Sequence, residues 1–174
     1  MVAYLLELGA LLFQMSTNGP ELTTKTTNSE ITELDILKMG SFFYMAIGQG
    51  NNWNYGLYEL PVSISNCNNL YHSYVYAFDV NDPDNQDHRY NGHNYCLLVV
   101  IIPKEMREFV QHPVNLEKQI QDFLMPYYNL SDFHDPGLLQ ELLRKIFPRQ
   151  NRPFKNIFSK TKQKASQKTL LVTQ

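Results

Sequence analysis

Histidines are the first residues to test for chemistry, because their spacing would reveal a metal site. The chain has five of them: His72, His88, His93, His112 and His134. No two have the spacing of a metal-binding pair such as His-Glu-x-x-His. The nearest pair shares a polar stretch with Asp87. This pattern favours solvated loop histidines, and we expect neither a metal nor a cofactor.

Acidic, glycine-rich and nucleophilic motifs are equally incomplete. The run Asp79, Asp82, Asp84 and Asp87 lacks the central Gly and closing Glu of a calcium loop, and Pro83 occupies a ligand position. Gly48-Gln49-Gly50 follows an expected helix, and no Gly-Lys-Ser/Thr accompanies it, so it indicates a turn. There is no Gly-x-Ser-x-Gly, and Cys96 lies in an apolar run. An enzyme with an unfamiliar site is therefore the least favoured class.

Two features allow either a purely structural or a functional interpretation. Arg89 is the only Lys or Arg between Lys38 and Lys104. It either pairs with a loop aspartate, at about 0–1 kcal/mol if exposed, or carries its charge to a partner. The aromatic cluster at the start of an expected strand either packs in the core or forms an interface patch. Its members are Trp53, Tyr55 and Tyr58.

The elements that position these residues follow from periodicity and turn residues. The run Tyr95–Ile102 is continuously apolar, whereas a half-buried strand alternates, so we expect a central strand with helices on both sides. The expected fold class is α/β (α+β), with a five-stranded antiparallel-type sheet between helices. The expected strands are Ala3–Leu8, Leu11–Ser16, Tyr55–Val62, Tyr71–Val80 and Tyr95–Ile102, with a hairpin turn at Gly9-Ala10 and a polar loop over Glu21–Ser29. The expected helical segments are Glu33–Ile47, a turn over Lys104–Gln111, a helix capped by Asn115, and a last helix capped by Asp135 that ends near Phe147.

The helix predicted over Glu33–Ile47 has two apolar faces. Thr32 and Asp35 have the spacing of a capping box, and Gly48 is a natural end. One face holds Leu34, Leu37 and Met45, and the other holds Ile36, Met39, Phe43 and Ile47. One should cover the sheet while the other meets more protein, from this chain or a partner. We expect the chain to self-associate or pair there, with Met39, Phe43, Tyr55 and Tyr58 near the contact.

Charge divides the chain into a body and a tail. All 17 acidic residues precede Pro148, whereas 7 of the 15 Lys and Arg residues follow it. We therefore expect a domain over residues 1–147 and a basic tail over 148–174 that acts as an electrostatic tether to a membrane. The tether residues are Arg149, Arg152, Lys155, Lys160, Lys162 and Lys164. The two cysteines and the absence of a signal-peptide pattern or membrane-length apolar stretch predict a cytoplasmic protein with peripheral membrane contact.

The element order β-β-α-β-β-β-α-α over residues 2–147 resembles the longin domain, a relative of the roadblock and profilin-like folds. The more specific part is Tyr74–Val80 followed by Asp82, Arg89, Gly92 and Tyr95. This segment is similar to longin domains of the folliculin and nitrogen-permease-regulator group, as is Asn18-Gly19-Pro20-Glu21. Here the loop before Arg89 is longer, and Tyr90 and Asn91 separate Arg89 from Gly92. Small longins in Asn-rich sequence would fit an archaeon with eukaryote-like GTPase systems.

The resemblance implies a non-catalytic module for small-GTPase regulation or membrane trafficking. Its implied partners are a small GTPase, another longin or roadblock protein, or a second copy in a homodimer, with no nucleic acid. It also implies that Arg89 could act in trans as an arginine finger that completes a GTPase site. The alternative is a membrane- or nucleic-acid-associated adaptor that acts through the basic tail.

Overall fold

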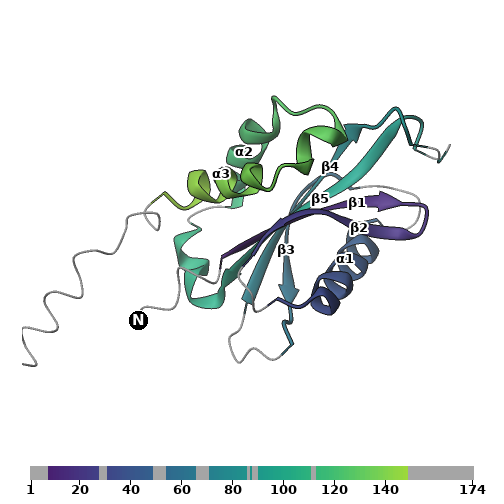
Figure 1. The fold of residues 1–174 in the computed structure, drawn as a ribbon. Helices are drawn as coiled ribbons and strands as arrows, with labels where there is room; N and C mark the ends of the chain where they lie inside the picture. Colours follow the sequence, from purple (N-terminus) through teal and green to yellow (C-terminus); the bar gives the residue numbers. More distant parts are fainter. Residues whose placement is uncertain are drawn as a thin grey trace, which may run out of the picture.

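A single antiparallel sheet of five strands forms the centre of the molecule (Figure 1). The computed structural model describes residues 8–27, 31–48, 54–65, 71–85, 87, 90–110 and 113–148. Along the sheet the strand order is β2-β1-β5-β4-β3. The strands are β1 (Gly9–Ser16), β2 (Gly19–Thr26), β3 (Gly56–Val62), β4 (Tyr71–Asn81) and β5 (His93–Pro103).

The central position of β5 confirms the expectation drawn from its apolar run. Every residue from Cys96 to Ile102 is fully buried, and β5 pairs with β1 on one side and β4 on the other. Alternate side chains of β5 enter two different cores. Burial on both faces explains why no polar residue interrupts the run.

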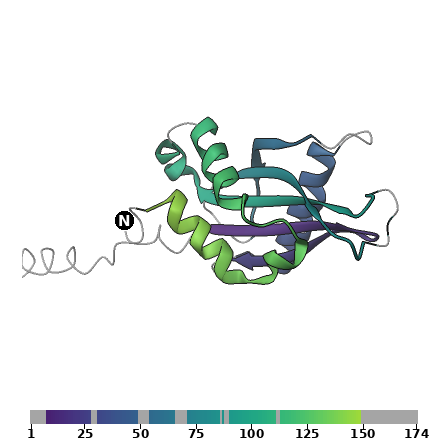
Figure 2. The same cartoon turned by 90° about the horizontal axis from the view of Figure 1, so that it is seen from above.

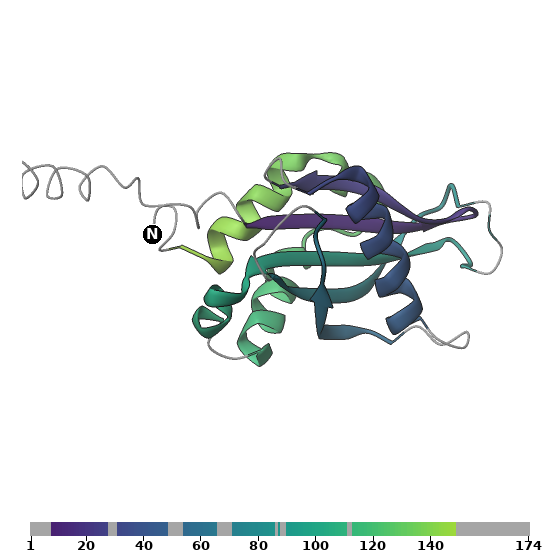
Figure 3. The ribbon, with the colours of Figure 1, turned by 90° about the horizontal axis from the view of Figure 1, so that it is seen from below.

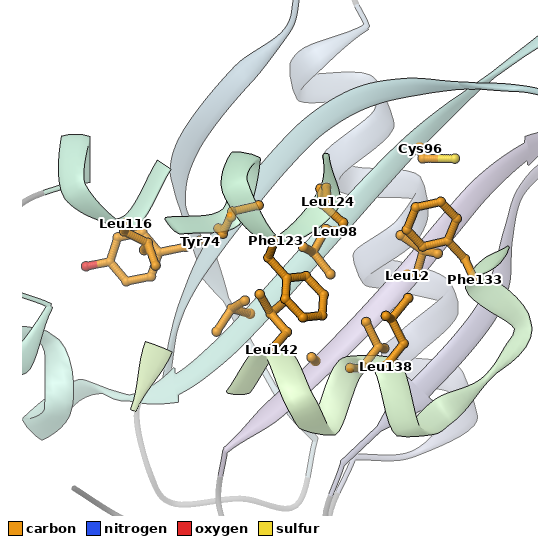
Figure 4. Packing of buried hydrophobic residues seen from close by; sticks show 14 of the residues in the cluster. Leu12, Tyr74, Cys96, Leu98, Leu116, Phe123, Leu124, Phe133, Leu138 and Leu142 are labelled. Atoms are coloured by element: carbon orange, nitrogen blue, oxygen red, sulfur yellow. The ribbon is translucent and has the colours of Figure 1, made fainter. Parts of the chain in front are cut away.

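Helices cover both faces of the sheet, as predicted. Helix α1 (Glu33–Ile47) lies on one face (Figure 3), while α2 (Pro113–Leu124) and α3 (Pro136–Ile146) lie on the other (Figure 2). Two short 3-10 helices, η3 (Lys104–Phe109) and η4 (Leu130–His134), flank α2 in the chain. Figure 4 shows the core on the α2/α3 face, where Phe123 and Leu142 meet Leu98 of β5.

Local signals located both ends of α1 correctly. The Thr32 hydroxyl accepts from the Asp35 N–H while the Asp35 side chain accepts from the Thr32 N–H, which is the predicted capping box. At the other end the Gly48 N–H donates to the Tyr44 carbonyl. Asp135 also caps α3 as expected, whereas α2 begins at Pro113, before Asn115. Helix caps depend on neighbours within a few residues, so they can be predicted from the sequence.

The hairpin near the N-terminus was predicted one strand too early in the chain, which is wrong. Leu11–Ser16 belongs to the first strand of the hairpin, and the turn lies at Thr17-Asn18, followed by Gly19 with φ of 112°. The Thr-rich stretch predicted as a loop is largely β2, an edge strand in which Pro20 is tolerated. Ala3–Leu8 lies, apart from Leu8, outside the described residues.

Candidate functional site

The inner face of α1 is held tightly against the sheet. A Cβ atom on Gly40 would lie 2.8 Å from Cε1 of Phe13 in β1, so only glycine allows this approach. One turn later, the Tyr44 hydroxyl donates to the Tyr95 carbonyl of β5 at 2.6 Å. These contacts fix which side of the helix points outward.

The N-terminus of α1 is anchored by the buried carboxylate of Asp35, which is 1% exposed. Its Oδ1 accepts hydrogen bonds from the N–H and hydroxyl of Ser65, and its Oδ2 accepts from the N–H and hydroxyl of Thr32. Burial alone would raise the pKa of Asp35, but these hydrogen bonds outweigh it and lower the pKa to about 2. The ionised carboxylate thus joins α1 to the segment after β3.

The outer face of α1 exposes large apolar side chains. Leu34, Leu37, Phe42 and Met45 are 57%, 60%, 43% and 65% exposed, and no described residue of the chain covers them. Between Leu34 and Met45 the only exposed charged residue is Lys38. A helix that is apolar on both faces normally meets protein on both. This outer face is the candidate interaction surface.

Two of the predicted interface residues lie on the wrong face of α1. Met39 and Phe43 are buried in this chain's own core, at 4% and 0% exposure, and cannot meet a partner without unpacking the helix. The sequence separated the two apolar faces correctly but did not say which one points inward. Gly40 was the available signal, because it shares the face of Met39 and Phe43 and marks close approach to the sheet.

A hollow of about 530 Å³ adjoins the outer face of α1 near its C-terminus. Ser41, Tyr44, Met45 and Gly48 line it from the helix side, and Met15 and Pro20 line it from the β1–β2 hairpin. Its walls are mainly apolar. The hollow therefore continues the exposed apolar surface from α1 onto the hairpin.

The predicted aromatic cluster is only partly described. Tyr55 is exposed; partial burial and, after it, the nearby Asp79 charge raise the pKa of its phenol. Tyr58 is half-buried and its hydroxyl donates to the Asn54 carbonyl at 3.1 Å. Trp53 lies outside the described residues. Tyr55 and Tyr58 thus sit at the start of edge strand β3, as expected.

Both edges of the sheet carry features that discourage the addition of another strand. Edge strand β3 contains Pro61 and the exposed Glu59. Edge strand β2 contains Pro20 and Lys25, and its pairing with β1 shifts between Leu12 and Phe13. Proline, charge and bulges are the usual protections of an edge. This arrangement favours α1 over a sheet edge as the place where a partner docks.

Arg89, the predicted arginine finger, lies outside the described residues, but the base of its hairpin is well connected. The Asn94 side chain donates to the Met15 carbonyl and accepts from the Met15 N–H, both at 3.0 Å. It also donates to Asp82 at 3.0 Å, and the Asp82 N–H donates to the Gly92 carbonyl at 2.8 Å. The β4–β5 hairpin is thus hydrogen-bonded to β1 next to its turn.

Residues capable of independent chemistry do not converge in the described part of the chain. Those residues contain no group of three or more His, Cys, Asp or Glu side chains that could hold a metal ion. Burial raises the pKa of the Cys96 thiol far above its ordinary range, which makes it a poor nucleophile. No helix among the described residues is long and apolar enough to cross a membrane.

The six predicted tether residues, from Arg149 to Lys164, also lie outside the described residues.

No protein-family model matches the chain, and no curated protein matches it.

Proposed function

We propose that this chain is a non-catalytic, longin-type interaction module that acts in small-GTPase regulation or membrane trafficking. The observation that carries the proposal is the apolar outer face of α1. Leu34, Leu37 and Met45 each expose more than half of their surface, which is unfavourable in water. Contiguous exposed apolar residues commonly mark a protein-binding surface.

The arrangement of elements supports the longin assignment. Two strands, one helix, three strands and two further helices follow each other in the order on which the resemblance rests. The β4–β5 hairpin that carries Arg89 stands on a hydrogen-bonded base, as a side chain delivered to a partner requires. Fold alone does not establish function, so the partner class is the part to test.

The test is capture of small GTPases by the immobilised full-length chain. Each small GTPase of the host is loaded with GDP or with a non-hydrolysable GTP analogue and passed over the chain. We expect at least one to be retained preferentially in one nucleotide state. Failure to retain any of them in either state would contradict the GTPase role.

The division of charge favours a second candidate function. All 17 acidic residues precede Pro148 and 7 basic residues follow it, so the tail differs in sign from the body. We propose, as the alternative, that the chain is an adaptor held at an anionic surface by this tail. Binding to such surfaces weakens with salt, which separates this role from apolar docking on α1.

A further inference from the structure

Asn91 and Gly92 form a tight turn directly before β5. Asn91 has φ of 51° and is the one residue other than glycine with a positive φ in the described part of the chain, and Gly92 follows with φ of 79°. The His93 N–H donates to the Tyr90 carbonyl at 3.0 Å, which closes a β-turn around this pair. Two positive φ angles at the central positions define a type I′ turn, for which Asn-Gly is the preferred sequence. Turn geometry therefore accounts for both residue types.

An Asn-Gly pair can also modify itself without an enzyme, by deamidation. The backbone nitrogen of the glycine attacks Cγ of the asparagine, the C–N bond of the side-chain amide breaks, and ammonia leaves with the glycine N–H proton. Water then opens the resulting succinimide ring at either carbonyl, which gives aspartate or isoaspartate. The reaction consumes only water. Glycine in the second position favours it, because no side chain shields the attacking nitrogen.

The structure leaves both reacting groups of this pair open. Asn91 is exposed, and neither its side-chain amide nor the Gly92 N–H has a hydrogen-bond partner among the residues that the structure describes. A Cβ atom on Gly92 would meet nothing within 4 Å, so open space adjoins its backbone. The Gly92 carbonyl accepts from the Asp82 N–H at 2.8 Å, which holds the turn without using either reacting group.

The chain contains the same dipeptide once more, at Asn18-Gly19, in a more restrained setting. Gly19 belongs to β2 and pairs with Ser16 of β1 across a two-residue turn. The Asn18 N–H donates to the Ser16 hydroxyl at 3.1 Å, and this hydroxyl donates to the Gly19 carbonyl at 2.9 Å. Paired residues at the closing end of a hairpin hold each other's backbone. Gly19 must therefore leave this pairing before its nitrogen can attack.

We propose that Asn91 is a site of spontaneous deamidation, which changes the charge of the hairpin that carries Arg89. Either product adds a negative charge two residues after Arg89, in a segment that already holds Asp82, Asp84 and Asp87. A more acidic hairpin repels an anionic group, such as a phosphate, more strongly. Isoaspartate also adds a methylene group to the backbone, which no longer fits the turn. The reaction involves this chain alone, so it goes beyond the proposed function and does not depend on it.

Peptide mapping of the full-length chain by mass spectrometry tests the proposal. The chain is incubated at mildly alkaline pH, and the conversion of Asn91 is compared with that of Asn18 over time. In the folded chain we expect Asn91 to react about fivefold faster, the factor that corresponds to the net contribution of one backbone hydrogen bond. In urea the two sites should react at similar rates, because only the shared dipeptide then matters.

Anion-exchange chromatography gives a second readout with matched variants. The incubated parent should accumulate an acidic species that elutes with Asn91→Asp, and an isoaspartate methyltransferase should label part of it. Asn91→Gly removes the reacting amide and keeps the turn, because Gly-Gly also fits type I′ geometry, so this species should disappear. Asn18→Gly is the matched control and should leave it in place.

Two results would overturn the proposal. One is conversion of Asn91 no faster than that of Asn18 in the folded chain, which would show that the open turn gives no advantage. The other is an acidic species that persists in Asn91→Gly, which would place the modification elsewhere. A chain that deamidates at Asn91 but captures no GTPase would leave this inference standing and contradict only the proposed function.

Discussion

At the scale of single residues, Asp35 makes a pH-dependent contribution to stability. Its pKa falls from 3.8 to about 2 on folding, because Ser65 and Thr32 hydrogen-bond to the ionised form against the cost of burial. A lowered folded-state pKa contributes stability that is present above the unfolded value and is lost as the pH falls toward 2. At about 1.4 kcal/mol per pKa unit, the contribution is about 2 kcal/mol.

Asp35→Asn should therefore lower the free energy of unfolding by about 2 kcal/mol at pH 7. The amide group adds donors where Ser65 and Thr32 already donate, and it does not ionise. The difference between parent and variant should shrink as the pH falls from about 4 to about 2. Urea unfolding across this range measures it. A difference that stays constant with pH would show that the ionised form of Asp35 is not specifically stabilised.

The role of Arg89 remains a prediction from sequence. An arginine finger stabilises the charge that develops on the transferred phosphoryl group and raises the rate by about 10³–10⁵. If Arg89 has this role, Arg89→Ala should abolish stimulation of a captured GTPase in single-turnover GTP hydrolysis, and Arg89→Lys should not restore it.

Arg107 provides the control for this experiment. Arg107 is exposed, and its Nε lies 2.8 Å from Oε1 of Glu59 on β3, away from the turn of the β4–β5 hairpin. Arg107→Ala should leave stimulation unchanged. If the Arg89 variants stimulate like the parent, or the parent never stimulates, Arg89 has no catalytic role and a loop ion pair is the better interpretation.

At the scale of elements, the packing of α1 on β1 depends on the absence of a side chain at Gly40. Alanine would favour the helix by about 1 kcal/mol, but its Cβ would lie 2.8 Å and 3.0 Å from two ring atoms of the buried Phe13. Overpacking of this kind costs about 1–3 kcal/mol. We expect Gly40→Ala to lower the free energy of unfolding by about 1 kcal/mol net.

Ser41→Ala is the matched control, because Ser41 is exposed on the same helix. It should raise stability by a few tenths of a kcal/mol through helix propensity alone. Chemical denaturation of both variants gives the comparison. If Gly40→Ala stabilised the protein as much as propensity predicts, Phe13 would have room to move and the close approach would not constrain α1.

At the scale of the whole molecule, the tail prediction concerns the six residues Arg149, Arg152, Lys155, Lys160, Lys162 and Lys164. Each could add about 1 kcal/mol near an anionic membrane, and salt would screen the attraction. The full-length chain should sediment with phosphatidylserine-containing vesicles at low salt and not with neutral vesicles. Replacing all six residues by Gln should remove this binding.

Neutralising Lys118, Arg144 and Lys145 on α2 and α3 gives a control on the body of the protein. That variant should bind vesicles like the parent. Equal binding by the parent and the tail variant would contradict the tether, whatever the body contributes.

Much of the fold could be predicted because its signals are local. The continuous apolar run of β5 indicated a central strand, and the capping box with Gly48 located α1 to the residue. The N-terminal hairpin was displaced because two turn sequences, Gly9-Ala10 and Asn18-Gly19, compete there. Pairing with β5 decides between them: β1 lies against β5 from Gly9 to Gln14, so its strand begins where the turn was expected.

The sequence by itself determined the helices, the last three strands, the central place of β5 and the two apolar faces of α1. The tertiary structure alone decided which face of α1 points outward and where the hollow lies. Those outcomes depend on contacts between distant segments, such as Gly40 against Phe13 and Asn94 against Met15. Periodicity reports that a face is apolar; only packing against the sheet removes one face from water and leaves the other exposed.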